Sequence, residues 1–240
     1  MAALTSYQLI QLPDRQALAQ RASELMAQAI DLALGQRDRC QVALAGGSTP
    51  EQAYHLLGRQ HLAWDRVDLL LGDERWVDAE DPLSNARMVR ASLLAAGPGS
   101  KACFHQVPTQ MVSVEEGIAS YNQTVEQLCG SSPPILDLVL LGLGDDGHTA
   151  SLFPGTAATR VTDRWVTHGE GKGIPRISFT APLLSAARQV IFLVAGSAKQ
   201  QALSRLLDPN ETPGRTPAKL VQPSTAILVL ADAEACAALG

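Results

Sequence analysis

A histidine and two aspartates follow a glycine-rich stretch near the middle of the chain. Residues 136–141 are apolar apart from one aspartate, and residues 142–148 read Gly-Leu-Gly-Asp-Asp-Gly-His. Because an imidazole ordinarily titrates near neutral pH and can take a proton from water, His148 is the candidate general base. Asp146, two residues earlier, could fix the imidazole tautomer or share its charge. The alternative is that His148 is a hydrogen-bonded loop residue without a chemical role.

The same glycines also match the dinucleotide-binding pattern Gly-x-Gly-x-x-Gly after a strand. Two features argue against that function. Asp145 and Asp146 would place carboxylates where a pyrophosphate lies, and Pro154 and Gly155 would end the crossover helix after a few residues. A nicotinamide-dependent oxidoreductase therefore remains as an alternative only, and we expect no cofactor.

Three further parts of the chain carry groups that could bind an anion. They are Gly46, Gly47, Ser48 and Thr49 between a predicted strand and helix, Asp73 and Arg75 after the next strand, and Arg176 and Lys199 at strand edges. Glycines let the backbone approach a ligand closely, and the free N–H groups of a helix N-terminus favour phosphate. Together with the cations they indicate an anionic substrate, most simply a phosphate ester. Taken singly, each segment could be an ordinary turn or a solvated surface group.

Several catalytic motifs are absent from the sequence. There is no Gly-x-Ser-x-Gly nucleophile elbow, no His-Glu-x-x-His motif and no cysteine beside the candidate histidine. If the protein is a hydrolase, the attacking group is therefore expected to be water, and no metal ion is expected. The other histidines, which lie outside the glycine loops, are interpreted as surface or packing residues: His55, His61, His105 and His168.

Composition restricts the class of protein. The chain has 240 residues, of which 46% are hydrophobic, and its formal net charge is −5. A disordered chain is excluded, and without a basic run we expect no nucleic-acid partner. No apolar run approaches the roughly 20 residues of a membrane span, so we expect no membrane association. The absence of a basic segment before Arg15 argues against a secretory leader, and four scattered cysteines predict reduced thiols in a cytoplasmic protein.

Strand-like and helix-like segments alternate along the chain. Strands are predicted over 41–45, 67–71, 136–141, 176–180, 189–195 and 226–230. Helices are predicted over 14–34, 84–97 and 113–128, and a short one is predicted after Thr180. Another is predicted to begin at an N-cap, Thr49, with Pro50 at the first helical position. The last two are predicted from a capping box formed by Ser197 and Gln200, and after Asp232. The segments 169–175 and 208–217 are interpreted as surface loops.

This alternation predicts an α/β fold with an open, mostly parallel sheet, helices on both faces and a single domain spanning 1–240. Ligands of such sheets bind beyond the carboxyl ends of the strands. We therefore expect the loops at 46–50, 72–75 and 142–148 to meet there.

Six motifs in order along the chain carry a resemblance to a known family. They are Ala45–Pro50, Gly72–Val77, Ser84-Asn85, Leu141–Gly155, Arg176–Ser178 and Gly196–Lys199. With them the chain resembles the 6-phosphogluconolactonases, in the superfamily that also contains glucosamine-6-phosphate deaminases. The stretch Gly142–Gly155 is highly specific, and the other motifs are individually moderate.

The resemblance implies hydrolysis of a small-molecule phosphosugar lactone, 6-phospho-D-glucono-1,5-lactone, in the oxidative pentose phosphate pathway. It also implies a Rossmann-like sheet without a nucleotide and without a required metal, and we expect a monomer. His148 becomes the base that activates water. The residues implied as phosphate or substrate contacts are Gly47, Ser48, Thr49, Arg176 and Lys199, with Asp73 and Arg75 lining the site.

Two other functions stay open. A deaminase would continue into a segment that resembles Ala-Phe-Asn-Glu-Pro-Gly, whose acid assists ring opening, but this chain has Phe153 where the acid would stand. A phenyl ring cannot transfer a proton, and this difference favours the lactonase. A phosphosugar-sensing regulator would need a DNA-binding head, and the sequence has no added helix-turn-helix or basic segment.

Overall fold

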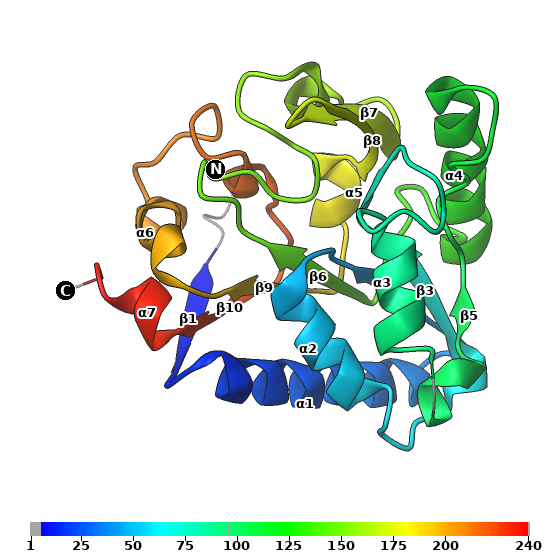
Figure 1. Ribbon diagram of the computed structural model, residues 1–240, viewed down its shortest axis with the longest axis horizontal. Helices are drawn as coiled ribbons and strands as arrows, with labels where there is room; N and C mark the ends of the chain where they lie inside the picture. The colour runs from blue at the N-terminus through cyan, green and yellow to red at the C-terminus, as the bar shows by residue number, and fades with distance from the viewer. Residues whose placement is uncertain (1–5, 96, 240) are drawn as a thin grey trace.

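Seven parallel strands form the central sheet of the molecule (Figure 1). The computed structural model describes residues 6–95 and 97–239. In spatial order the strands are β1 (Tyr7–Leu12), β10 (Ile227–Asp232), β9 (Gln189–Val194), β6 (Leu138–Gly142), β2 (Cys40–Leu44), β3 (Val67–Leu71) and β5 (Cys103–Phe104). All neighbouring pairs are parallel, as the sequence predicts.

The path of the chain through this sheet reverses once. Helices α1 (Arg15–Leu34), α2 (Ser48–Leu57) and α3 (Asn85–Ser92) connect strands that advance toward β5. Helices α4 (Val114–Cys129), α5 (Ala181–Ser185) and α6 (Gln200–Leu207) precede strands that return toward β1, and α7 (Ala233–Cys236) follows β10. Crossovers between parallel strands are right-handed as a rule, and with this reversal the rule puts the two sets of helices on opposite faces. Helix α2 packs against both α1 and α3. The strands β2 and β6 therefore flank the point where the strand order reverses, which is where such sheets bind ligands.

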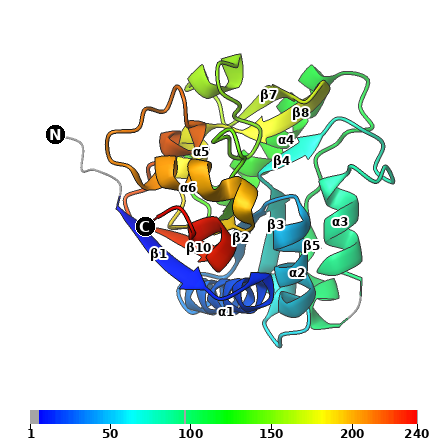
Figure 2. The ribbon, with the colours of Figure 1, turned by 60° about the vertical axis from the view of Figure 1, so that its left-hand side comes forward.

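A second, antiparallel sheet lies at the end of the molecule opposite α1 (Figures 1 and 2). It contains β4 (Asp73–Arg75), β8 (Ile174–Phe179) and β7 (Val166–Gly171) in that order. Two expectations were wrong here. The segment 169–175 is not a loop throughout, because 169–171 end β7, 174–175 begin β8, and only 172–173 form the exposed turn between them. The strand near 176–180 belongs to this sheet instead of the parallel one. Short strands rich in glycine and charged residues carry a weak local pattern, so their pairing depends on tertiary contacts.

Most helix starts follow the predicted caps. The side chains of Asp14, Ser84, Ser113 and Asp232 each accept a hydrogen bond from a backbone N–H three residues later. Two predicted starts were wrong. Helix α2 begins at Ser48 after Gly47, and no side-chain cap is present before α6, where the 3₁₀ turn Ser197–Lys199 follows Gly196. Gly47 and Gly196 have φ values of 104° and 92°, and this left-handed geometry turns the chain earlier than a side-chain cap would.

Short 3₁₀ turns complete the connections. They are η1 (Trp64–Arg66), η2 (Pro98–Lys101), η3 (Ala157–Arg160), η4 (Ser197–Lys199) and η5 (Pro217–Leu220), the last of which follows the predicted loop near 208–217. Of the helices within the described residues, none combines the length and apolarity that crossing a membrane requires.

Two buried tyrosines hold the strand ends that lead to the reversal point. The Tyr54 hydroxyl donates to the carbonyl of Ala45 and accepts from its N–H, both at 2.9 Å. The Tyr121 hydroxyl bonds the N–H and carbonyl of Leu71 in the same way, at 2.8 and 3.0 Å. All residues of β2 and β3 are buried. Each tyrosine thus satisfies backbone groups where a strand leaves the hydrogen-bonded ladder, because buried polar groups are costly when unpaired.

An ion-pair network surrounds Asp68, which lies near the amino end of β3. Its carboxylate accepts from Arg39 Nε at 2.7 Å and Nη2 at 2.8 Å, and it contacts His105 Nε2 at 2.9 Å. Burial acts to raise the pKa of Asp68, but the hydrogen bonds from His105, Arg39 and Gln41 outweigh it and hold this pKa well below its usual range. This network joins β2, β3 and the segment after β5.

Candidate active site

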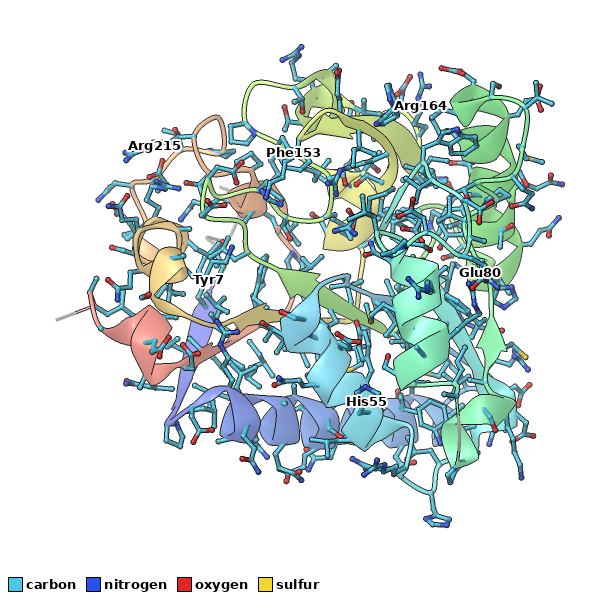
Figure 3. The ribbon with its side chains drawn as sticks, in the orientation of Figure 1. Tyr7, His55, Glu80, Phe153, Arg164 and Arg215 are labelled. Atoms are coloured by element: carbon cyan, nitrogen blue, oxygen red, sulfur yellow. The ribbon has the colours of Figure 1, made fainter. Side chains whose placement is uncertain are left out.

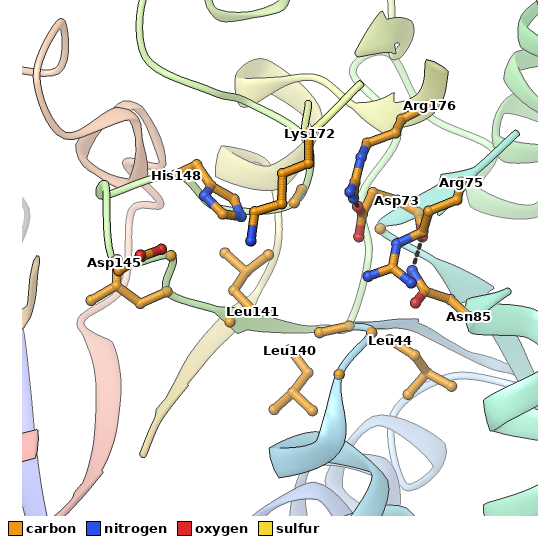
Figure 4. Close-up of a pocket in the computed structure, with 18 of the residues that line it drawn as sticks. Leu44, Asp73, Arg75, Asn85, Leu140, Leu141, Asp145, His148, Lys172 and Arg176 are labelled. Atoms are coloured by element: carbon orange, nitrogen blue, oxygen red, sulfur yellow. Dashed lines mark hydrogen bonds and ion pairs between the residues drawn. The ribbon is translucent and has the colours of Figure 1, made fainter. Parts of the chain in front are cut away.

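A pocket of about 290 Å³ lies beyond the carboxyl ends of β2, β3 and β6 (Figure 4). The three loops that the sequence predicts to meet do form its walls, together with the β7–β8 hairpin. Of the predicted site residues, those that line it are Gly46, Gly47, Asp73, Arg75, His148, Arg176 and Lys199. The side chains of Ser48 and Thr49 do not line it, and Asp146 reaches it only through its contact with His148.

The imidazole of His148 is fixed by Asp146. Its Nδ1 lies 2.5 Å from Asp146 Oδ1, which also accepts the His148 backbone N–H at 3.0 Å. Burial acts to raise the pKa of Asp146, but these hydrogen bonds from His148 outweigh it and lower the pKa below its usual value. In the neutral imidazole, an ionised Asp146 favours the tautomer with the proton on Nδ1, in which Nε2 is the acceptor.

The imidazole is also confined on its faces. A Cβ atom at Gly144 would lie 2.0 Å from His148 Nδ1, so only glycine leaves room for the ring there. The ring of Phe153 stacks against the imidazole with centroids 4.1 Å apart and planes inclined by 31°. Gly171 in turn lies against the Phe153 ring, where its own Cβ would come within 2.1 Å of a ring carbon. The hairpin strand β7 thus supports His148 through Phe153.

The loop that carries His148 is closed by hydrogen bonds to its own strand. Thr149 Oγ1 donates to the carbonyl of Gly142 at 2.8 Å, and the Gly144 N–H donates to the carbonyl of His148 at 2.8 Å. Gly147 has a φ of 92°, a conformation that L side chains rarely adopt. The glycine-rich sequence therefore forms a tight turn that presents His148, and a helix does not follow it as a dinucleotide site would require.

Asp73 and Arg176 form a buried pair in the opposite wall. Asp73 Oδ2 accepts from Ser151 Oγ at 2.6 Å and lies 3.5 Å from Arg176 Nη1. Register in the antiparallel sheet brings them together, because Asp73 pairs with Ser178 and Arg75 with Arg176. Burial lowers the pKa of Arg176, while Asp73 opposes the effect. The charge of Arg176 is thus already compensated within the protein.

A buried carboxylate positions the residues beside this pair. Glu74 accepts the backbone N–H groups of Asn85 and Ala86 at 2.8 and 2.7 Å, which fixes the start of α3. Burial raises the pKa of Glu74 above its usual range, although backbone hydrogen bonds oppose the shift. Arg75 donates from Nη1 to the carbonyl of Leu83 at 2.5 Å, and its buried Nε meets no acceptor in the part of the chain that the structure describes.

Two side chains line the pocket although they are absent from the predicted set. Asn85 donates from Nδ2 to the carbonyl of Asp73 at 2.9 Å, and its amide packs against Gly46. The motif Ser84-Asn85 was the available signal for it. Lys172 projects into the pocket from the tip of the β7–β8 hairpin (Figure 4). It lies in the stretch interpreted as a surface loop, and no local signal distinguishes it from a solvated lysine.

The remaining histidines lie elsewhere. His55, His61 and His168 are exposed, and His105 contacts Asp68 at the far edge of the sheet. Figure 3 shows His55 on α2, whereas Phe153 lies near the second sheet. Among residues 6–95 and 97–239 there is no group of three His, Cys, Asp or Glu side chains that could hold a metal ion.

This arrangement brings an imidazole that could act as a general base together with several cationic side chains. The Nε2 atom of His148 is available to deprotonate water, while Lys172, Lys199 and Arg75 bring positive charge to the same pocket. The N-terminus of α2, beside Gly46 and Gly47, adds backbone N–H groups that lack partners inside the helix. Such a site suits addition of water to an electrophilic carbonyl in an anionic molecule.

Comparison with known proteins gives a consistent result. A model of the family "Glucosamine-6-phosphate isomerases/6-phosphogluconolactonase" matches residues 13–230. The chain is 41% identical over 225 residues to a 6-phosphogluconolactonase of Synechocystis sp., covering 92% of this chain and 94% of that protein. It is 42% identical over 231 residues to one of Nostoc sp., covering 95% and 96%.

Solved structures agree in fold. A 6-phosphogluconolactonase from Shewanella baltica superposes with a TM-score of 0.86 at 27% identity, covering 95% of this chain and 98% of that one. A 6-phosphogluconolactonase from Trypanosoma cruzi gives 0.88 at 26% identity, covering 99% and 98%.

Proposed function

Because the chain belongs to the glucosamine-6-phosphate isomerase/6-phosphogluconolactonase family, we propose that it hydrolyses 6-phospho-D-glucono-1,5-lactone to 6-phospho-D-gluconate. The observation that carries the mechanism is the imidazole of His148, whose Nδ1 is held 2.5 Å from Asp146 while its Nε2 stays available in a cationic pocket. The proposed reaction belongs to the oxidative pentose phosphate pathway.

His148 Nε2 takes a proton from water as the water oxygen adds to the lactone carbonyl carbon. The carbonyl π electrons move to the oxygen and form a tetrahedral oxyanion, and Arg75 is the cation that we place against it. When the oxyanion collapses, the bond to the ring oxygen breaks, and this oxygen receives the proton back from His148. The product acid then loses a proton to solvent. Asp146 stabilises the protonated imidazole between the two transfers.

No covalent intermediate is part of the proposal. The residues that line the pocket include no serine, threonine or cysteine within the described ranges. Ser151, the nearby hydroxyl, is buried and does not line the pocket, and it donates to Asp73, which is itself paired with Arg176. A lactone carbonyl is already electrophilic, and activated water is sufficient to attack it.

We place the phosphate at the N-terminus of α2, with Gly46, Gly47, Ser48 and Thr49 contributing backbone N–H groups. Lys199 adds positive charge beside the phosphate. Arg176, which is paired with Asp73, is the other cation that we place in this phosphate site. We also propose that the protein acts as a monomer in the cytoplasm, where its four free cysteines would stay reduced.

The direct test generates the lactone in situ and follows acid release, with glucosamine-6-phosphate supplied in parallel and ammonia measured. Lactone hydrolysis without ammonia is expected, because Phe153 offers no acid for ring opening. His148→Ala should lower kcat by about 10²–10⁴-fold and leave KM almost unchanged. Ammonia release without lactone hydrolysis, a trapped acyl-enzyme or an undiminished His148→Ala rate would reject the proposal.

A further inference from the structure

Two residues other than glycine adopt a left-handed backbone among the described residues, and both line the pocket. Ala150 has a φ of 47° and Lys172 a φ of 57°. This conformation is unfavourable for an L residue because Cβ crowds the following carbonyl. Such strain persists where the surroundings enforce it and collects at functional sites. Lys172 is the more informative case, since it lies at an exposed hairpin tip with little packing to enforce its conformation.

The turn at this tip favours another residue type. Lys172 and Gly173 are the two central residues, because Gly171 pairs with Ile174 across the hairpin. Both central φ values are positive, at 57° and 75°, which is the pattern of a type I′ turn. Asn-Gly and Gly-Gly are the preferred sequences for that turn. The preference of the turn therefore does not explain why position 172 is a lysine. The explanation has to come from what the lysine side chain does.

That side chain is directed into the pocket, on the side where His148 lies (Figure 4). In residues 6–95 and 97–239 no carboxylate forms an ion pair with it, whereas Arg176 is paired with Asp73. Lys199 likewise has no ion-pair partner in those ranges. No ion pair within those ranges compensates the charge of the two lysines, although Asp145 also lines the pocket.

We infer that Lys172 binds the phosphate group of the substrate. A phosphate carries its full charge before the reaction begins, so its ligand does not have to be held rigidly in advance. The amine of a lysine on its flexible stem can therefore bind it from a hairpin tip. Stabilisation of a transition-state oxyanion would instead require a donor that is held rigidly in advance. The inference rests on the proposed function, because that function supplies the phosphorylated substrate.

The test uses Lys172→Asn, which creates the preferred Asn-Gly turn while removing the charge. Its Tm should rise by about 1–4 °C, because asparagine tolerates the left-handed backbone. Its kcat/KM for the phosphorylated lactone should fall by about 10–100-fold, through KM, since a charge-assisted hydrogen bond is lost. Lys172→Arg should recover most of the affinity. The matched control is Lys101→Asn at an exposed position in η2, outside the pocket, which should change neither parameter.

Unphosphorylated glucono-1,5-lactone provides the second comparison. Wild-type protein and Lys172→Asn should hydrolyse it at equal rates if Lys172 acts on phosphate. Equal losses on both lactones, a change in kcat alone, or an unchanged KM for the phosphorylated lactone would overturn the inference.

Binding of inorganic phosphate, measured by calorimetry, separates this inference from the proposed function. Weaker binding to Lys172→Asn than to wild type supports Lys172 as an anion ligand even if the wild-type protein does not hydrolyse the lactone. Equal binding to both proteins counts against Lys172 even if hydrolysis is normal.

Discussion

Gly171→Ala offers a sharp test of the packing that holds His148. Gly171 is buried in β7, and its φ lies outside the left-handed region, so its backbone accepts alanine. The added Cβ would stand 2.1, 2.3 and 2.7 Å from three carbons of the Phe153 ring. The same ring packs against His148, with centroids 4.1 Å apart. The added methyl group of Gly171→Ala should therefore displace the Phe153 ring, and the displaced ring should shift the imidazole of His148.

The expected size of the effect follows from these distances. Carbon atoms need about 3.5 Å between them, so the ring has to retreat by at least about 1.4 Å. Overpacking of this kind should lower the free energy of unfolding by about 1–3 kcal/mol. Displacement of the imidazole by about 1 Å should lower kcat by about 10²-fold, because the distance from the base to the attacking water changes. KM should change less, since the α2 N-terminus and Lys199 do not contact Phe153, although the Arg176 guanidinium lies over its ring, 5.4 Å from the centroid.

The assay combines lactone hydrolysis with urea unfolding. Gly214→Ala is the matched control, because its Cβ would have no heavy atom within 4 Å and its φ is also ordinary. In a Phe153→Ala background the alanine at 171 should cost little in unfolding free energy, since no ring remains to clash. If Gly171→Ala retains wild-type kcat and stability, Phe153 does not hold His148 in the way described here.

Two further results are expected. Asp68→Asn should lower the free energy of unfolding by about 1–3 kcal/mol at pH 7, because it leaves Arg39 and His105 without their carboxylate, although Arg39 is partly exposed. Since the pKa of Asp68 is held well below its usual range in the native state, its contribution is fully present above about pH 4 and shrinks as the pH falls toward that lowered pKa, so the difference between the variant and the wild type in urea unfolding should be smaller at pH 3 than at pH 7; a constant difference would contradict this. Exhaustive dialysis against EDTA should leave lactonase activity unchanged, because the mechanism uses only water, His148 and cationic side chains; activity that is lost and then restored by one specific ion would contradict it.

The elements that the sequence predicted well are those whose signals are local. Residues 67–71 form β3 with the predicted bounds, and Asp14 and Ser113 cap their helices. Apolar runs and capping side chains act within a few residues, so a short window contains the whole cause. The meeting of the three loops could also be predicted, because parallel strands bring their carboxyl ends to one edge.

Tertiary structure decided the positions of the side chains that depend on pairing between distant strands. Arg176 faces Asp73 only because β8 pairs with β4, about a hundred residues earlier in the chain, and nothing near either residue encodes that register. Lys172 enters the pocket for the same reason, since the hairpin that carries it is held over the site by β4. The sequence alone determined which loops carry the base and the glycines. Which cations remain uncompensated beside them was set by strand pairing, because the field at a site depends on distances that only the folded chain defines.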